Sequence, residues 1–399
     1  MLWWLKRGTD GFRMDVINLI SKVPGLPDAE VIDPEAKYQK YGKLSVNGPR
    51  VHEFIQEMNN RVLSKFPEAI TVGQTKLTHD PSQIIKYVQP ERKELNMVFQ
   101  FELNDLDAHP SNALIPVQYK LSDLKKVVKK WQEYMYENGG WNTLYHENHD
   151  LGRSITRMLG IKDPRDPLRA RGAKLLSILQ NTQGGTLYVH EGQELGMMNV
   201  PADWDIEEYK AVATQNFYRE VLDKRIKETG NSKPDMSDVM AGINLKARDN
   251  GRTPVQWSSA PHGGFTSPNA IPWMRVNDDY PYWNAEVQLN DPDSVLSFWK
   301  RTISFRKANK VLTYGDFKLL SPEDEKIFAY TRNLNNLTAL VIMNFSKEKT
   351  TYSDSIVGVT GTAKFLHGNV VSDAVPSLSL EEFEVSLEAW EGRVFIKDV

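Results

Sequence analysis

Short apolar runs and amphipathic helical patterns alternate along most of this 399-residue chain. Apolar runs that end on polar residues predict strands at residues 11–16, 69–74, 97–103, 142–150 and 186–190. Between and after them, apolar residues recur at the spacing of a helix face, which predicts helices over residues 1–7, 50–66, 122–138, 169–181, 207–226 and 295–312. Strand followed by helix at this spacing indicates a parallel sheet covered by helices.

Several boundaries of these elements carry local signals. Pro67 ends the helix over residues 50–66, and Ser122 is the predicted N-cap of the helix that Gly139 ends. The stretch over residues 18–46 is irregular and rich in proline, which indicates a long loop after the first strand. Loops in this position commonly form the walls of a functional site.

The pattern changes at about residue 313. Residues 327–331 and 338–345 alternate apolar and polar positions around Asn335 and Asn336, which indicates antiparallel strands joined by a tight turn. Short strand patterns continue to Val399. The sequence therefore predicts an α/β domain over residues 1–312 and a small antiparallel β domain over residues 313–399.

Composition narrows the range of partners. Forty-nine basic and 52 acidic residues leave a net charge of −3, which is too balanced to favour a nucleic acid or an anionic membrane surface. The absence of cysteine excludes disulfides and thiolate metal sites, and no apolar run approaches the roughly 20 residues of a membrane helix. We therefore expect a cytoplasmic protein that binds a small neutral substrate.

Three of the predicted strands end on polar groups that could do chemistry. In the first, predicted to be buried, the period of two places Arg13 and Asp15 on the same side, and an arginine beside a carboxylate keeps it ionised, as a nucleophile requires. Gln74 ends the second strand, and His149 with Asp150 closes the third. A structural Arg–Asp pair is the alternative at the first strand, but three such strand ends favour a site.

Four motifs lie in order along the chain: Gly11-Phe12-Arg13-Met14-Asp15, Thr71-Val72-Gly73-Gln74, Glu147-Asn148-His149-Asp150 and Arg248-Asp249-Asn250-Gly251-Arg252-Thr253-Pro254-Val255-Gln256-Trp257. In sequence and approximate spacing they resemble the α-amylase family of retaining glycoside hydrolases (glycoside hydrolase family thirteen). Within it, they are similar to the α-glucosidase and oligo-1,6-glucosidase (maltase, isomaltase) branch. The resemblance runs nearly from end to end of the chain.

The resemblance implies a fold. We expect part of a (β/α)8 TIM barrel, from about its fourth strand to its eighth helix, followed by a small all-β antiparallel sandwich domain. Residues 1–7 would match the helix before the fourth strand. The barrel would then be N-terminally incomplete, either because this is a partial chain or because the gene product has lost its front.

The resemblance also implies roles for individual residues. Asp15 would be the catalytic nucleophile, and Asp150 would be the third acid, which holds sugar hydroxyls and favours the oxocarbenium-like transition state. Arg13 and His149 would bind the same sugar ring, and Arg248 would reach the sugar or the acids around it.

Position 74 departs from the family pattern, because Gln74 stands where the resemblance implies the glutamate that is the general acid/base. An amide has nearly the shape of a carboxyl group, but it cannot deliver a proton to the leaving oxygen or activate water. Such assistance is worth roughly a hundred to ten thousandfold, so we expect impaired turnover, and we expect the missing N-terminal part of the barrel to impair it as well. Glu147, Glu191 and Glu194 are not expected to replace it.

Alternatives remain open. A non-catalytic relative that binds sugar or serves as an interaction subunit would also carry Gln74, whereas the intact Arg13, Asp15 and Asp150 favour an enzyme. Trehalose-phosphate hydrolases, dextran glucosidases and sucrose isomerases share the four motifs, and only Val16, the residue type that α-1,6-acting members tend to have after the nucleophile, mildly favours isomaltose-type substrates.

The sequence does not favour a metal site. His146, Glu147, His149 and Asp150 are metal-ligand types, but side chains at these positions diverge on a strand. We expect no metal, no cofactor, no nucleic acid and no membrane as partners, and a monomer if the protein is full length.

Overall fold

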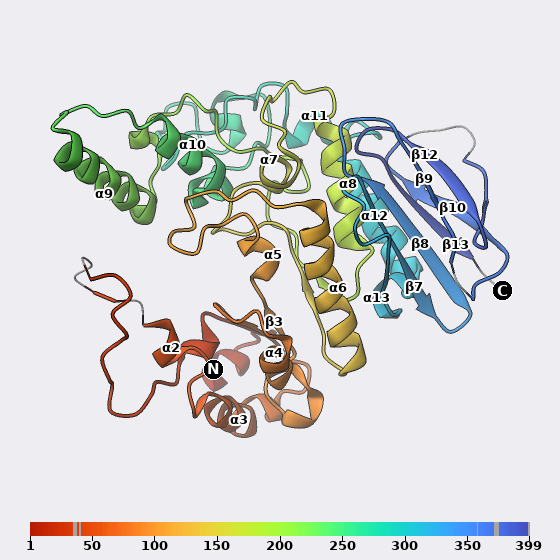
Figure 1. Cartoon of the computed structure of the whole chain (residues 1–399), viewed down its shortest axis with the longest axis horizontal. Helices are drawn as coiled ribbons and strands as arrows, with labels where there is room; N and C mark the ends of the chain where they lie inside the picture. Colours follow the sequence, from red (N-terminus) through yellow and green to blue (C-terminus); the bar gives the residue numbers. More distant parts are fainter. Residues whose placement is uncertain (35–37, 40, 357, 371–374, 398–399) are drawn as a thin grey trace. The chain divides into compact units, whose positions relative to one another are not determined.

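The computed structural model describes residues 1–34, 38–39, 41–356, 358–370 and 375–397 (Figure 1). The chain divides into two compact units. Unit 1 comprises Met1–Leu103, Lys126–Leu144 and Gly184–Thr186, and unit 2 comprises Asn104–Lys125, Tyr145–Gln183 and Leu187–Val399. Of the long loop predicted over residues 18–46, positions 35–37 and 40 lie outside the described residues.

Unit 1 is built on parallel strands in chain order. β1 (Gly11–Met14), β2 (Ile70–Gln74) and β3 (Met97–Phe99) form one sheet, in which Met14 pairs with Gly73 and Gln74 with Phe99. A parallel bridge joins Val98 to Asn142, next to β4 (Thr143–Leu144). Consecutive strands that lie side by side without a reversal of order are typical of a (β/α)8 barrel rather than of a doubly wound sheet.

Helices connect these strands. The helices of unit 1 are α1 (Leu2–Leu5), α2 (Gly42–Ser45), α3 (Val51–Arg61), α4 (Pro81–Val88) and the C-terminal part of α6 (Leu121–Glu137). Their inward residues, such as Ile55, Ile84 and Trp131, are buried. Gly139 ends α6 as predicted: its φ is +67°, and the backbone N of Gly140 donates to Met135 O over 2.8 Å, which closes a Schellman turn.

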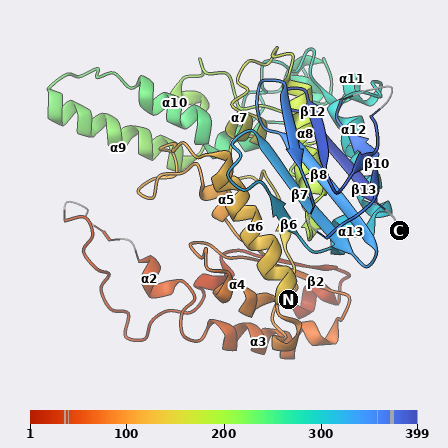
Figure 2. The same ribbon diagram turned by 45° about the vertical axis from the view of Figure 1, so that its right-hand side comes forward.

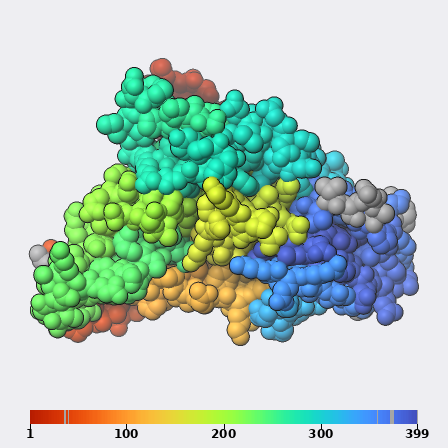
Figure 3. Space-filling model, turned by 90° about the horizontal axis from the view of Figure 1, so that it is seen from above, coloured from red at the N-terminus to blue at the C-terminus, as the bar shows by residue number. Residues whose placement is uncertain are grey.

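The helices of unit 2 include α7 (Ser154–Leu159), α8 (Arg169–Asn181), α9 (Val212–Thr229), α10 (Ser237–Lys246), α11 (Ala285–Leu289), α12 (Val295–Ala308) and α13 (Lys310–Tyr314). α8 has the predicted bounds and is buried over most of its length. It packs against α12, and both lie beside the C-terminal sheet (Figures 1 and 2). In Figure 3 the residues of unit 2 drawn in yellow lie between those drawn in teal and those drawn in blue.

The C-terminal part of unit 2 is an antiparallel β sandwich. Its strands are β6 (Lys318–Leu320), β7 (Ile327–Leu334), β8 (Leu337–Asn344), β9 (Thr350–Asp354), β10 (Thr362–Gly368), β11 (Leu378–Ser379), β12 (Phe383–Leu387) and β13 (Gly392–Lys397). One sheet has the order β11-β10-β13-β8-β7-β6 and the other pairs β12 with β9, and both contribute to one apolar core. Asn335, at φ +54°, and Asn336 form the predicted tight turn between β7 and β8.

Several predicted strands are too long. β3 stops at Phe99 instead of residue 103, because Gln100 Oε1 accepts from the backbone N of Glu102 (2.9 Å) and the chain turns into α5 (Glu102–Asp105). The strand predicted over residues 186–190 is only β5 (Thr186–Leu187). Gln193 Oε1 accepts from the backbone N of His190 (3.3 Å), so this N–H is not available for pairing with a neighbouring strand.

Some helix ends are also corrected. Ser122 is not the N-cap of α6, because the helix begins at Leu121 and the Asp123 carboxylate accepts from the backbone N of Lys120 (3.0 Å). The helix predicted from residue 207 begins at Val212, because Asp249 Oδ1 accepts from the backbone N of Ala211 (2.9 Å). The helix predicted over residues 295–312 is interrupted at Asn309, which is not helical.

The predicted fold class is confirmed in both of its parts, parallel βα units followed by an antiparallel sandwich. The boundary between domains at residue 313 stays a prediction. Among the described residues, no helix is both long enough and apolar enough to cross a membrane. The cytoplasmic location also stays a prediction.

Gly11→Ala is expected to disrupt the pairing of β1 with β2. A Cβ at Gly11 would overlap the carbonyl oxygen of Ile70, which is backbone and can move only if the parallel register breaks. We expect the free energy of unfolding in urea to fall by about 3 kcal/mol, the upper end of the cost of overpacking. Gly42→Ala is the control, since its Cβ would meet only Leu77 Cδ1 at 3.5 Å. Equal stability of the two variants would contradict the register.

Candidate active site

The first group of predicted site residues lies at the carboxyl ends of β1 and β2 in unit 1. Arg13 Nη1 donates to Asp15 Oδ1 over 2.6 Å, and Arg13 Nη2 donates to Gln74 Oε1 over 2.7 Å. Gln74, the last residue of β2, is buried at 3% exposure. One guanidinium therefore holds the side chains from two neighbouring strand ends close together.

The turn after Asp15 is strained. Val16 has φ 39° and ψ 43°, in the left-handed region, where a β-branched side chain is rare and costs of order 1–3 kcal/mol. Its backbone N donates to Gln74 Oε1 over 3.4 Å, so the second strand end also supports the turn. Strain of this kind concentrates at functional sites.

The prediction that the first strand is buried is wrong. The side chain of Asp15 is 68% exposed and that of Arg13 is 38% exposed, because β1 buries neither face fully. At such exposure an ion pair contributes at most about 1 kcal/mol to folding. The contact therefore orients the Asp15 carboxylate, which stays accessible, more than it stabilises the fold.

The second group lies in unit 2 around Asp150. The predicted strand over residues 142–150 is only β4, and the chain from residue 145 to 150 forms a loop that ends in a turn. Asp150 Oδ1 lies 3.2 Å from Arg248 Nη2, and Asp150 Oδ2 lies 3.6 Å from His149 Nε2. The backbone N of Asp150 donates to Asn148 Oδ1 over 2.8 Å, which supports the turn without strand pairing.

Arg252 is a contact of Asp150 that sequence reasoning missed. Its Nη2 lies 3.0 Å from Asp150 Oδ1, and its Nε donates to the backbone O of His149 over 2.6 Å. It follows Arg248 by four residues in the 3-10 helix Arg248–Arg252. Its place in the motif already singled out for Arg248 was the available signal.

Glu147 has a separate, structural environment. Its Oε2 lies 3.1 Å from Arg153 Nη1, and its Oε1 accepts from the backbone N (2.8 Å) and Oγ (2.6 Å) of Ser154. Both partners are buried. This carboxylate therefore accepts hydrogen bonds from an arginine and from the first residue of α7.

The other two carboxylates considered as substitutes for an acid at position 74 also have partners of their own. Glu191 is 70% exposed, with Oε2 3.2 Å from His190 Nδ1. Glu194 Oε2 accepts from the backbone N of Gly192 over 2.8 Å, and burial raises the pKa of Glu194.

The structure thus brings Arg13, Asp15 and Gln74 together in unit 1, and His149, Asp150 and Arg248 together in unit 2. That the two groups meet around one sugar ring stays a prediction, as do the roles of the individual residues.

Comparisons with known proteins add a second line of evidence. The family description "Alpha amylase, catalytic domain" matches residues 1–315. The chain is 41% identical to an α-glucosidase of Schizosaccharomyces pombe over 353 residues, which are 88% of this chain and 59% of that protein. It is 41% identical to an oligo-1,6-glucosidase of Parageobacillus thermoglucosidasius over 397 residues, 99% of this chain and 66% of that protein.

A solved structure is similar over the whole chain. The crystal structure of trehalose-6-phosphate hydrolase from Bacillus licheniformis matches with a TM-score of 0.85 at 35% identity, covering 100% of this chain and 67% of that one. This match supports the fold class described above. The chain spans 59% and 66% of the lengths of the two curated relatives.

His146, next to Glu147, generates a prediction about pH. It is 3% exposed, and its Nδ1 has no hydrogen-bond partner within the described part of the chain. Burial, with a smaller contribution from Arg157, lowers the pKa of His146 from 6.5 to about 4. The folded protein therefore keeps the imidazole neutral, while the unfolded chain takes up a proton as the pH falls below 6.5. Stability should fall between these two pKa values, by up to about 3 kcal/mol.

Urea unfolding of the parent and of His146→Gln at about pH 7.5, 6 and 5 measures this effect, because the variant keeps the other titratable groups. The parent should lose stability more steeply with acidification than the variant does. Parallel pH dependences would mean that His146 does not contribute.

Proposed function

The chain belongs to the α-amylase family, and from that premise we propose that it is a retaining α-glucosidase-type glycoside hydrolase. It acts on α-glucosidic bonds of maltose- or isomaltose-type oligosaccharides. Two curated relatives, named α-glucosidase and oligo-1,6-glucosidase, are each 41% identical to it and support this substrate class.

The shared guanidinium of Arg13 is the observation that carries the proposal. Retaining hydrolysis needs a carboxylate nucleophile and a second group about 5 Å away that acts first as acid and then as base. Arg13 contacts both Asp15 (2.6 Å) and Gln74 (2.7 Å), so a nucleophile and the residue at the acid/base position share one support. The exposed Asp15 carboxylate is open to a substrate.

Each residue then has one step. Asp15 attacks the anomeric carbon, the glycosidic C–O bond breaks, and a covalent glycosyl ester forms. Asp150, oriented by Arg248 and Arg252, stabilises the positive charge that develops on the sugar ring. In the second step water displaces Asp15 and must give up a proton.

Gln74 removes proton transfer from both steps. Its amide can hold the leaving oxygen by an N–H hydrogen bond, but it can neither protonate that oxygen nor take a proton from water. Turnover of natural glycosides should therefore be lower by roughly a hundred to ten thousandfold than with a carboxyl group at position 74.

A second candidate is a non-catalytic sugar-binding or interaction protein of the same family. Gln74 favours it, because an amide can hold a sugar oxygen by a hydrogen bond but cannot exchange a proton with it. A site so arranged could bind an oligosaccharide and leave it intact. Arg13, Asp15, His149 and Asp150, all retained, favour the enzyme.

The proposal also covers the preferred glycosidic bond, the location of the protein and its oligomeric state. The residue type of Val16 favours α-1,6 over α-1,4 bonds, and the balanced charge fits a neutral oligosaccharide. We propose that the protein is cytoplasmic, needs no cofactor, binds no nucleic acid and, in its full-length form, is a monomer.

Gln74→Glu separates the two candidates. Restoring the carboxyl group should raise kcat on p-nitrophenyl α-glucoside, maltose or isomaltose by roughly a hundred to ten thousandfold, because proton transfer returns to both steps. Asp15→Asn in the Gln74→Glu protein is the matched control and should remain inactive. If folded Gln74→Glu protein is as inactive as this control on all three substrates, the hydrolase proposal is refuted and the binding protein is favoured.

A further inference from the structure

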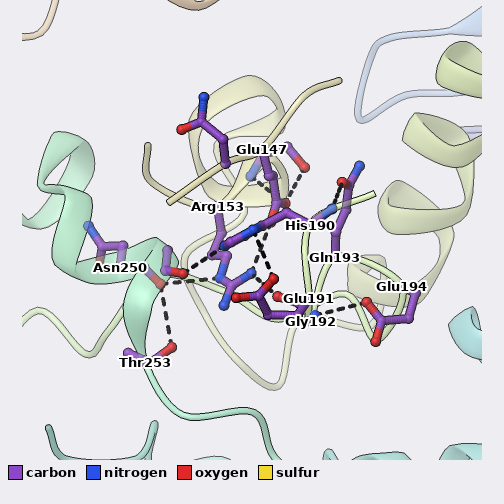
Figure 4. Close-up of polar contacts among 12 residues, drawn as sticks. Glu147, Arg153, His190, Glu191, Gly192, Gln193, Glu194, Asn250 and Thr253 are labelled. Atoms are coloured by element: carbon purple, nitrogen blue, oxygen red, sulfur yellow. Dashed lines mark hydrogen bonds and ion pairs between the residues drawn. The ribbon is translucent and has the colours of Figure 1, made fainter. Parts of the chain in front are cut away.

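Arg153 is fully buried and joins three loops of unit 2. Its Nη1 donates to Glu147 Oε2 (3.1 Å) and to the backbone O of Glu191 (2.8 Å), and its Nε donates to the backbone O of Asn250 (3.2 Å). Figure 4 shows the guanidinium among the loop after β4, the loop after β5 and the 3-10 helix Arg248–Arg252.

The loop that carries Asp150 has Arg153 near its C-terminal end and Glu147 at its N-terminal end. The second carboxylate oxygen of Glu147 accepts two hydrogen bonds from Ser154, the first residue of α7. The segment from Glu147 to Ser154 is thereby closed into a ring by the Glu147–Arg153 and Glu147–Ser154 contacts. Asp150 lies at the turn of this ring, and it is itself outside the buried cluster.

The position of Asp150 also depends on the neighbouring 3-10 helix. Arg252 Nε donates to the backbone O of His149 (2.6 Å), and His190 Nε2 lies 2.8 Å from the backbone O of Gly251. The two segments pack backbone to backbone: a Cβ at Gly251 would lie 2.6 Å from Leu151 O. A shift of one segment therefore moves the other.

We propose that Arg153 is a positioning residue for Asp150. By holding Glu147 and the carbonyl of Asn250 at fixed separation, it sets the distance between the Asp150 turn and the two arginines that orient the Asp150 carboxylate. Arg153 acts through these groups and makes no contact with a substrate. The effect of Arg153 on catalysis rests on the proposed function. Its effect on the Asp150 turn and on the 3-10 helix Arg248–Arg252 does not.

The chemistry of the side chain explains why arginine is needed here. A guanidinium is planar and presents five N–H donors in fixed directions, so one group can serve a carboxylate and two carbonyl oxygens that lie in different directions. A lysine ammonium keeps the charge and the pair with Glu147, but it is a single point on a flexible stem. Arg153→Lys should thus keep the ion pair and lose the contact with Asn250.

Arg169 provides a matched control. It is equally buried in unit 2, pairs with Asp279 over 2.6 Å, and donates to the backbone O of Gly196 (3.1 and 3.0 Å). Gly196 lies on the loop after β5, as Glu191 does, but none of these partners belongs to residues 147–154 or 248–252, the segments around Asp150. Arg169→Lys therefore measures the general cost of replacing a buried arginine in this unit.

Amide hydrogen exchange of the full chain tests the proposal directly. In Arg153→Lys, amides of residues 148–152 and 249–252 should exchange about tenfold faster or more, while Arg169→Lys leaves them unchanged. Glu147→Gln should reproduce the effect, and it replaces Arg153→Lys if that variant does not fold. Unchanged exchange in both segments, or equal acceleration by Arg169→Lys, overturns the proposal.

Kinetics then tests the catalytic consequence in the Gln74→Glu protein. Arg153→Lys should lower kcat on p-nitrophenyl α-glucoside by about tenfold or more with little change in KM, because Asp150 acts on the transition state, and Arg169→Lys should leave both constants unchanged. Equal losses in the two variants overturn the positioning role. An inactive Gln74→Glu parent refutes the proposed function instead, and the exchange experiment still decides whether Arg153 holds the two segments.

Discussion

The parallel pairing of β1 with β2 is the constraint on which the site in unit 1 depends. Because Met14 pairs with Gly73, Asp15 and Gln74 leave their strands at the same edge of the sheet. A slip of one residue would turn either side chain to the opposite face. Arg13 can contact both groups only in this register, and the strained Val16 turn then directs the Asp15 carboxylate outward.

The two groups of site residues are held by different physical means. The Arg13–Asp15 pair is exposed and contributes little to folding, so its geometry comes from strand register. Asp150 is set by buried groups behind it, above all the pair of Arg153 with Glu147. Removing one partner of such a buried pair typically costs about 3–5 kcal/mol. The orientation of Asp150 in unit 2 therefore depends on the stability of the buried core. The orientation of Asp15 in unit 1 depends instead on the register of the sheet.

The periodicity of apolar residues along the chain predicted the features of the fold that depend on local interactions. The bounds of α8, the turn at Asn335 and the end of α6 at Gly139 follow from helix-face spacing and from residues that tolerate positive φ. The misses have another origin, since side chains near or distant in sequence hydrogen-bond to the backbone, and glutamines two or three residues away end β3 and β5 early. Asp249 takes the amide of Ala211, and Arg252 and Arg153 join loops about one hundred residues apart. Such contacts leave no periodic signal, so short strands and the supports of Asp150 required the structure.

Gln74 keeps the shape of the residue expected at the acid/base position but cannot transfer a proton. The role of Asp15 is therefore tested most directly with a glucosyl donor whose leaving group needs no proton. With α-glucosyl fluoride, Asp15 forms a bond to the anomeric carbon as fluoride leaves, and the amide at position 74 cannot activate water for the second step. Mass spectrometry should find one glucosyl group on the peptide that contains Asp15, and none on Asp15→Asn. An adduct on another residue, or no adduct on folded protein, would contradict Asp15 as the nucleophile.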